Sequence, residues 1–445
     1  MSAPLPVGWS RLHPLTPLLR GGRFFLLVGV YAGQQGLRQS DSKVLLGILA
    51  IGTPLAVVLG FFSWRAMRYR VEGAELHLDS GILQRRSRRV PLVRVQSIDV
   101  VRPLFARVLG LAELRLEVVG GGDTEARLSY LTEDQAQQLR ARLLGLVAGE
   151  RAGDGPAGEV PAGGVPAGAA VRQPAGIAPE AVLVTVPTGV LVMSVLLGAP
   201  TLTLVVLLVA AGLGLLVDAG VVLPVVLAAG PVLLGVVTAS GRRLLTEYGF
   251  TVAESPDGLR LRHGLLDTRS QTIPSGRVQT VRVREPLLWR RQGWVRLEVD
   301  VAGYAGGRGE EQAATSALLP VAPRALAESL LERVLGGPLP AASLAAPRRA
   351  RLRAPLQHRR LRVGVDATHL VATYGVLTTT TDVVPLAKVQ SLRLTAGPWQ
   401  RRLGLASLHV DTAGRRLPGA VARHRDAGQA RELLGRVNEL AKGAR

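Results

Sequence analysis

The sequence predicts an α+β multi-domain membrane protein. Three copies of one small β-rich domain, each closed by a C-terminal helix, accompany two transmembrane helical hairpins. Two observations lead to this fold class. Two long blocks of the 445-residue chain are almost free of charge, as membrane-spanning helices require. Three other segments share a pattern of glycine, proline and glutamine at fixed spacing, which is the signature of an internal repeat.

The first uncharged block lies near the N-terminus. Val44–Trp64 contains no charged residue, and about 20 apolar residues suffice for a helix to cross the hydrocarbon core. Phe24–Leu37 is also uncharged but shorter and more polar, so it qualifies only as the first arm of a hairpin. We therefore expect a transmembrane hairpin within residues 1–64.

The second uncharged block, Ala181–Gly241, contains a single charge at Asp218. Two long helices or three short ones would fit its length. Arginines flank both blocks on their outer sides, whereas the turn around Asp218 has none. The positive-inside rule then places both termini and the β domains in the cytoplasm and requires an even number of spans in each block. We expect four membrane spans, with a hairpin at 181–241. Asp218 could mark the pathway of a transporter, but an external turn is the simpler interpretation, because no partner for it is visible.

The repeat has a fixed frame. A glycine precedes a proline by 10 residues, the proline precedes a glutamine by 5, and the glutamine precedes a second glycine by 14. The frame residues are Gly81, Pro91, Gln96 and Gly110; Gly264, Pro274, Gln279 and Gly293; and Gly375, Pro385, Gln390 and Gly404. The short runs between them predict antiparallel strands. The glycines predict turns with positive φ, and the prolines predict a strand start, edge or bulge. The glutamines could line a shared binding groove, but we favour a structural role in satisfying buried backbone groups.

Each repeat ends in an amphipathic helix. Thr132 and Gln135 form a capping box in the first, Pro323 and Gly336 bound the second, and Asp426 opens the third. The expected organisation is a hairpin at 1–64, β domains at 65–148, 242–337 and 362–445, a hairpin at 181–241, a flexible Pro/Gly/Ala-rich linker at 149–180 and a basic linker at 338–361.

The core pattern is G-[IVL]-L, then [VI]-P-x-x-[RK]-[VI]-Q-[ST], then R-x-x-G. Linked to paired membrane helices, it resembles the bacterial pleckstrin-homology-like (PH-like) domains of the YdbS/YdbT-like membrane proteins. The order of hairpins and domains resembles the longer, YdbT-like members, and the resemblance covers most of the chain. It implies a PH-type fold of two sheets closed by a helix, and it implies no catalytic residue, since such domains recruit or scaffold. It also implies a protein partner, such as a shorter single-domain PH-like relative.

Positive charge is concentrated in the third domain and the segment before it. The chain has a net charge of +21, and residues 348–445 contribute +13 from 19 basic and 6 acidic residues. We expect membrane lipids to be partners, with candidate headgroup contacts at Arg348, Arg349, Arg351, Arg353, Arg359, Arg360 and Arg362, and at the recurring Arg107, Arg290 and Arg401. The alternatives are a solvated connector for 348–362 and, for the recurring arginines, packing beside an acidic residue. No nucleic-acid motif accompanies the charge, so we expect no nucleic acid.

The sequence contains no motif for catalysis. Cysteine is absent, which excludes disulfides and thiolate chemistry. The seven histidines are scattered without metal-ligand spacing, and no phosphate-binding loop or nucleophile elbow occurs. We expect no enzyme and no cofactor, but a membrane-anchored scaffold with a role in envelope homeostasis or stress tolerance. The alternatives are an anionic-lipid-binding or lipid-handling protein and a transporter component.

Overall fold

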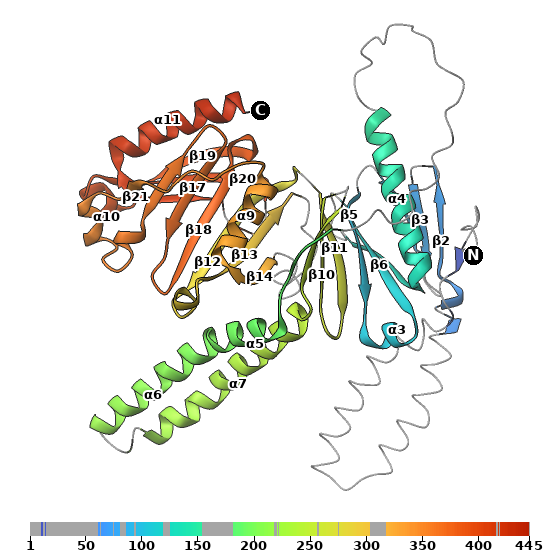
Figure 1. Ribbon diagram of the computed structural model, residues 1–445, viewed down its shortest axis with the longest axis horizontal. Coiled ribbons are helices and arrows are strands. Elements are labelled where there is room, and N and C mark those ends of the chain that lie inside the picture. The colour runs from blue at the N-terminus through green and yellow to red at the C-terminus, as the bar shows by residue number, and fades with distance from the viewer. Residues whose placement is uncertain are drawn as a thin grey trace. The chain divides into compact units, whose positions relative to one another are not determined.

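The chain is seen in a computed structural model (Figure 1). Two compact units form: Met1–Gly176 with Asp267–Gln271, and Ile177–Leu266 with Thr272–Arg445. The expected hairpin at 1–64 falls almost wholly outside the described residues, and so do most of the expected linker at 149–180 and Asp218. The structure describes residues 10–11, 14, 61–62, 64–73, 75–80, 86–92, 95–118, 125–153, 181–217, 220, 222–255, 258–274, 276–302, 317–414, 417 and 419–444.

The first unit contains the first repeat. Strands β1 to β4 form one antiparallel sheet in sequence order, β5 to β7 pair in turn, and α4 packs on β5, β6 and β7. Leu76, Leu114 and Leu139 bring both groups of strands and the helix into one core. The elements are β1 (Ser10–Arg11), β2 (Arg68–Glu72), β3 (Glu75–Ser80), β4 (Arg86–Pro91), β5 (Val95–Arg102), α3 (Leu104–Val108), β6 (Leu111–Val118), β7 (Glu125–Thr132) and α4 (Glu133–Gly153).

The second repeat carries the helical hairpin. Strands β8, β9 and β10 pair in order, β12 pairs with β13, β13 pairs with β14, and α9 packs on β13 and β14. The elements are β8 (Ala181–Thr185), α5 (Thr188–Leu196), α6 (Ala199–Val217), α7 (Val222–Glu247), β9 (Thr251–Ser255), β10 (Gly258–His263), β11 (Thr268–Ile273), β12 (Val278–Pro286), η3 (Trp289–Gln292), β13 (Trp294–Val301), β14 (Ala317–Pro323) and α9 (Arg324–Leu335).

The third repeat follows the same plan. Strands β15 to β18 pair in order, β19 to β21 form a separate three-stranded sheet, and α11 packs on that sheet. The elements are β15 (Leu344–Ala345), η4 (Arg348–Leu352), η5 (His358–Arg360), β16 (Arg362–Val365), β17 (His369–Tyr374), β18 (Thr378–Pro385), η6 (Leu386–Lys388), β19 (Val389–Thr395), α10 (Pro398–Arg402), β20 (Leu405–Thr412), β21 (Val421–Asp426) and α11 (Ala427–Gly443).

In the described part of the chain, each repeat therefore contributes four strands, then three strands, then a closing helix. This confirms the expected α+β architecture of repeated antiparallel sheets. One feature of the plan is visible only in the structure: each repeat has an insertion between its first and second strands. In the first repeat the insertion is residues 12–67, in the second it is α5–α7, and in the third it is the arginine-rich stretch 346–361.

The insertion in the second repeat is a pair of apolar helical arms. Among the described residues, one helical stretch, Thr188–Leu216, is long and apolar enough to cross a membrane. Its 29 residues span about 43 Å at 1.5 Å per residue. The arm formed by α6 packs against α7, and both arms expose large apolar side chains such as Leu216 and Leu234. The two arms leave the β domain side by side in Figure 1.

Two expected domain boundaries are wrong. Residues 181–185 were assigned to a membrane hairpin, but they form β8 and pair with β9, and α7 continues beyond residue 241 to Glu247. Residues 338–361 were assigned to a linker, but β15 pairs with β16 and Ala350 and Leu361 are buried in a small core of the third repeat. Both segments therefore belong to folded β domains.

The expected helix ends are largely confirmed. Thr132 and Gln135 exchange the two hydrogen bonds of a capping box, each at 3.4 Å. Gly336 ends α9 with φ of 80°. The Asp426 carboxylate accepts a hydrogen bond from the backbone N–H of Gly428 at 2.9 Å. Pro323, expected at the first helical position, instead lies one residue earlier, as the N-cap.

Candidate functional site

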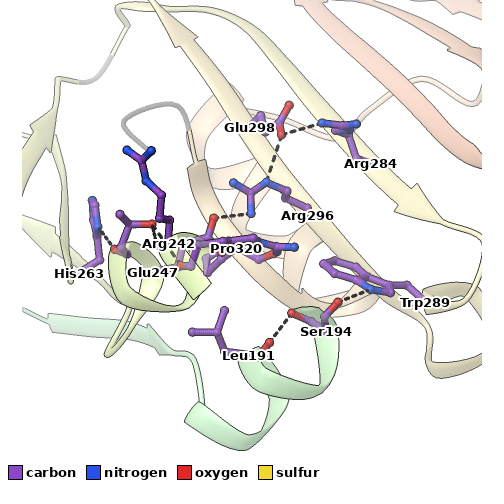
Figure 2. Close-up of polar contacts among 12 residues, drawn as sticks. Leu191, Ser194, Arg242, Glu247, His263, Arg284, Trp289, Arg296, Glu298 and Pro320 are labelled. Carbon is purple, nitrogen blue, oxygen red and sulfur yellow. Dashed lines mark hydrogen bonds and ion pairs between the residues drawn. The ribbon is translucent and has the colours of Figure 1, made fainter. Parts of the chain in front are cut away.

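A buried network of charges fastens the helical arms to the second repeat (Figure 2). Glu247, at the end of α7, is almost fully buried and lies between two arginines. Its Oε2 accepts a hydrogen bond from Arg243 Nε at 2.9 Å, and its Oε1 lies 2.6 Å from Arg296 Nη1 on β13. Arg296 Nε donates to Glu298 Oε1 at 3.1 Å, and Arg284 Nη1 donates to the same oxygen at 3.3 Å. The network joins α7 to the sheet.

The charges in this network support one another. Burial alone would lower the pKa of Arg296, but the carboxylates of Glu247 and Glu298 outweigh burial and raise it. Removal of one partner from a buried ion pair costs about 3–5 kcal/mol, because it leaves an uncompensated charge in the interior. The network therefore fixes the direction in which α7 leaves the domain.

Neutral contacts complete the attachment of the arms. The fully buried indole of Trp289 donates from Nε1 to the carbonyl oxygen of Ser194 on α5 at 2.9 Å. The ring of His263 stacks on Phe250 with centroids 5.1 Å apart, and its Nδ1 lies 2.7 Å from the carbonyl oxygen of Thr246. Figure 2 shows Trp289 and His263 on opposite sides of the charge network. The base of the hairpin is thus held by α5, α7 and the sheet together.

The described frame residues lie at turns, strand ends and bulges. All five described frame glycines have positive φ, as the sequence predicts: Gly110, Gly264, Gly293, Gly375 and Gly404 lie between 63° and 109°. A Cβ on Gly375 would overlap the carbonyl oxygen of Thr378. Gly81 and the side chain of Gln96 are not among the described atoms. The prolines end strands rather than start them, at Pro91 and Pro385, and Pro274 follows β11.

The frame glutamine marks a β-bulge in every repeat. The pairing register shifts between Val95 and Ser97, between Val278 and Thr280, and between Val389 and Ser391. In each case the skipped residue is the glutamine of the frame. Gln279 is buried and its Nε2 donates to the carbonyl oxygen of Arg277 at 3.3 Å. This supports the structural role for the amide.

The recurring arginine contacts the hairpin turn of the following repeat. Arg290 Nη2 donates to Thr379 Oγ1 at 2.9 Å and to the carbonyl oxygens of Val376 and Leu377 at 3.2 Å. Within the first unit, Arg107 Nη1 donates to Thr268 Oγ1 at 3.2 Å. In both contacts the guanidinium donates to hydroxyl or carbonyl oxygens.

Strand pairing joins the second and third repeats into one sheet. β12 pairs antiparallel with β18, in the sheet order β14-β13-β12-β18-β17-β16-β15. Arg282 donates to both carboxylate oxygens of Asp382, from Nε at 2.6 Å and from Nη2 at 3.2 Å. Asp382 is 1% exposed. Burial alone would lower the pKa of Arg282, but the Asp382 carboxylate raises it. The junction is thus a β-sheet sealed by a bidentate ion pair.

Comparison with known proteins agrees with this architecture. The family model described as bacterial PH domain matches residues 23–147, 181–338 and 333–441, which together make up most of the chain. The chain belongs to the bacterial PH domain family. Among curated proteins it is similar to the UPF0699 transmembrane protein YdbT of Bacillus subtilis (strain 168), with 28% identity over 98 residues. That match covers 22% of this chain and 19% of the relative. No solved structure matches the chain.

The arginine-rich segment of the third PH domain is folded and faces solvent. Its apolar residues Ala350, Ala354 and Leu361 pack with Leu405. Arg349 forms an ion pair with Asp426, and Arg360 donates to the carbonyl oxygen of Val376. The exposed arginines are Arg348, Arg349, Arg351, Arg353, Arg359 and Arg362. The segment therefore presents a row of guanidinium groups on a defined scaffold.

Sequence reasoning missed the acids that organise these PH domains. Asp382, Glu247 and Glu298 are buried or nearly so. Arg282 lies 100 residues from Asp382 in the sequence, whereas Arg243 is four residues from Glu247 and Arg296 is two residues from Glu298. The available signals were a carboxylate inside an apolar strand pattern and, for Glu247, an arginine four residues earlier on the same helix. Among the described residues, no group of three or more His, Asp or Glu side chains could hold a metal ion.

Proposed function

We propose that this protein is a non-enzymatic scaffold anchored at the cytoplasmic face of a bacterial plasma membrane, where its PH domains bind a protein partner. The observation that carries the proposal is what the buried charged residues and the recurring arginines contact. In the second and third repeats, buried charges and Arg290 attach one sheet to the next and attach the helical arms to the sheet, so these two repeats form a platform on a pair of apolar helices. A role in envelope homeostasis or stress tolerance is consistent with such a platform.

Several observations support the membrane anchor. The stretch Thr188–Leu216 has the length and apolarity of a span, and α7 lies antiparallel to it with Leu227, Leu234 and Val237 exposed. Exposed leucines and valines on a packed helical pair are unfavourable in water and stable in lipid. The similar Bacillus protein is named a transmembrane protein. We infer that α6 and α7 are the two arms of a hairpin, that residues 1–64 contain another, and that the flanking arginines keep the PH domains in the cytoplasm.

The test is affinity capture of the full chain from membranes in mild detergent, followed by quantitative mass spectrometry. A scaffold retains at least one protein in a fixed ratio to the bait. A matched bait with Glu247→Ala, in which the arm is released from the sheet, is expected to retain less. If no protein is enriched over an unrelated membrane protein of similar size, the scaffold proposal fails.

A second candidate function is the binding of anionic lipid by the third PH domain. Its arginine-rich segment occupies the insertion point that carries the helical arms in the second repeat. Leu352 and Leu356, in the same segment, are 77% and 80% exposed. Basic residues beside exposed leucines are typical of surfaces that enter a headgroup layer. We infer that this face can contact lipid headgroups.

This second function has its own test. The chain lacks cysteine, so Leu356→Cys accepts a single environment-sensitive fluorophore. In nanodiscs that contain phosphatidylglycerol the emission is expected to shift to the blue relative to nanodiscs of phosphatidylcholine alone. Equal spectra in the two lipids would contradict the lipid contact.

A further inference from the structure

The two strand pairings that involve the long bulged strands share one register. In the second unit, Thr379, four residues after a frame glycine, lies opposite Glu285, six residues after a frame glutamine. Within the first unit, Thr268 lies opposite Arg102, and these residues occupy the same two frame positions. In both cases the recurring arginine donates to the threonine hydroxyl. The repeats therefore carry a reusable connection: a bulged strand and an arginine on one side, a hairpin edge on the other.

The third repeat has the bulged strand and the arginine of this connection, but among the described residues no hairpin edge pairs with them. Its bulged strand β19 pairs with β20, and the described part of the chain provides no strand for its other edge. Gln390 and Ser391 are exposed, whereas their counterparts Gln279 and Thr280 are buried. A free strand edge presents unpaired backbone groups that can accept another strand.

The side chains along β19 also match those of the junction between β12 and β18, which we call the closed junction. Arg393 occupies the frame position of Arg282, and Asp411 on β20 occupies that of Asp300. In the closed junction Asp300 is fully buried and its Oδ2 accepts from the backbone N–H of Leu417 at 2.9 Å. In the third repeat Arg393 and Asp411 form only a loose pair at 3.6 Å, with 62% and 41% of their side chains exposed.

The third repeat also has the recurring arginine of this connection, Arg401. It occupies the position of Arg290 and lies exposed at the end of α10. Arg290 binds a hairpin turn through three oxygens, whereas the described residues offer the guanidinium of Arg401 no such turn. The edge thus has the residues of a junction in an unfilled state.

We propose that the outer edge of β19, together with Arg393 and Arg401, is a docking site for the edge strand of a PH-like domain on a separate polypeptide. The inference rests on the proposed scaffold function and specifies its partner. The partner strand carries a carboxylate opposite Arg393, as Asp382 does opposite Arg282, and a threonine-bearing turn for Arg401.

Charge argues against a second copy of this chain as the occupant. Among the described residues, β4 is an edge strand of the sheet of the first repeat, and it is the counterpart of β18. At the frame position of Asp382, seven residues after the frame glycine, β4 carries Arg88. Head-to-tail pairing of two copies would place Arg88 opposite Arg393, and like charges directly opposite each other destabilise a strand pair. A separate chain with an acidic residue there has no such conflict.

The test uses the full chain in detergent and a synthetic hairpin with the sequence of His369–Pro385, closed by a terminal disulfide and labelled with a fluorophore. Anisotropy is expected to show saturable binding to the wild type and at least tenfold weaker binding to Arg393→Glu. A hairpin with lysine in place of the aspartate should restore binding to Arg393→Glu. Arg436→Glu, an equal charge change on the exposed face of α11, is the matched control and should bind as the wild type does.

Each other outcome would overturn the proposal. Absence of saturable binding, or equal losses in Arg393→Glu and Arg436→Glu, would show that β19 is not a strand-docking edge. Concentration-dependent dimers of the wild type that Arg393→Glu abolishes would identify a second copy as the occupant. If affinity capture still recovers a protein partner with Arg393→Glu, the scaffold function holds but acts through another surface.

Discussion

The Arg282–Asp382 pair allows the strength of the junction between the second and third PH domains to be measured. Asp382→Ala removes a carboxylate that is 1% exposed and accepts two hydrogen bonds from one guanidinium, at 2.6 and 3.2 Å. Arg282 then remains buried without a counter-charge. Breaking a buried pair in this way costs about 3–5 kcal/mol. We expect the pairing of β12 with β18 to weaken by that amount.

Hydrogen exchange followed by mass spectrometry measures this cost locally. Since about 1.4 kcal/mol corresponds to a tenfold change in an equilibrium constant, the amides of β18 should exchange roughly 100 to 3,000 times faster in Asp382→Ala. The double variant Arg282→Met/Asp382→Leu removes both charges and should recover most of the protection, because apolar replacements of a buried pair are often neutral.

The third repeat provides an exposed pair for comparison, in which Arg393 occupies the frame position of Arg282. Asp411→Ala removes the partner of Arg393, but that pair is exposed and 3.6 Å apart, so it contributes about 0–1 kcal/mol. Exchange in β19 and β20 should rise by less than tenfold. If Asp382→Ala and Asp411→Ala change exchange equally, or if Asp382→Ala costs less than about 1 kcal/mol, the account of a sealed junction is refuted.

Three further predictions follow from the site. Glu247→Ala should destabilise the attachment of α7 by about 3–5 kcal/mol, seen as faster exchange in β13, whereas an unchanged rate would contradict the role of the network. His424 has its pKa lowered, by burial first and then by Arg353 and Arg423, so its contribution to stability is present above the unfolded pKa of about 6.5 and is lost as pH falls through the lowered folded value. The third domain should therefore melt at a lower temperature at pH 5 than at pH 7.5, and His424→Asn, which tolerates the positive φ of 51°, should reduce that difference; an equal difference in both proteins would contradict this. Gly375→Ala should destabilise the β17–β18 turn, since its φ of 107° and the nearby Thr378 carbonyl leave no room for a Cβ; a variant with wild-type melting would refute the frame assignment.

The repeat frame made the fold predictable to a large extent. Spacing alone located the strands and turns, because glycine at positive φ and a glutamine at a bulge are local requirements that the sequence must meet in every copy. The caps at Thr132 and Asp426 were predictable for the same reason, since a capping side chain contacts backbone only two or three residues away.

The errors arose where local pattern is ambiguous. An apolar run such as Ala181–Thr185 reads alike as membrane helix and as buried strand, and only its pairing with β9 decides. In residues 338–361 the many arginines suggested a solvated linker, but alanines between them are buried and pack the segment against the third domain.

The partners of the recurring arginines could not be found from sequence. Arg107 and Thr268 lie 161 residues apart, and Arg290 and Thr379 lie 89 apart. Their contact depends on how one repeat meets the next, which no local pattern encodes. The same holds for Arg282 and Asp382, 100 residues apart, so the junction is a property of the assembled repeats.

The central claim, that an apolar hairpin holds the PH domains on the cytoplasmic side of a membrane, is tested most directly by cysteine accessibility. Because the chain has no cysteine, Gly220→Cys between α6 and α7 and Lys442→Cys in α11 each give a single reactive thiol. In spheroplasts, a membrane-impermeant maleimide should label Gly220→Cys at once and Lys442→Cys only after permeabilisation. Labelling of Lys442→Cys in intact spheroplasts would contradict the account.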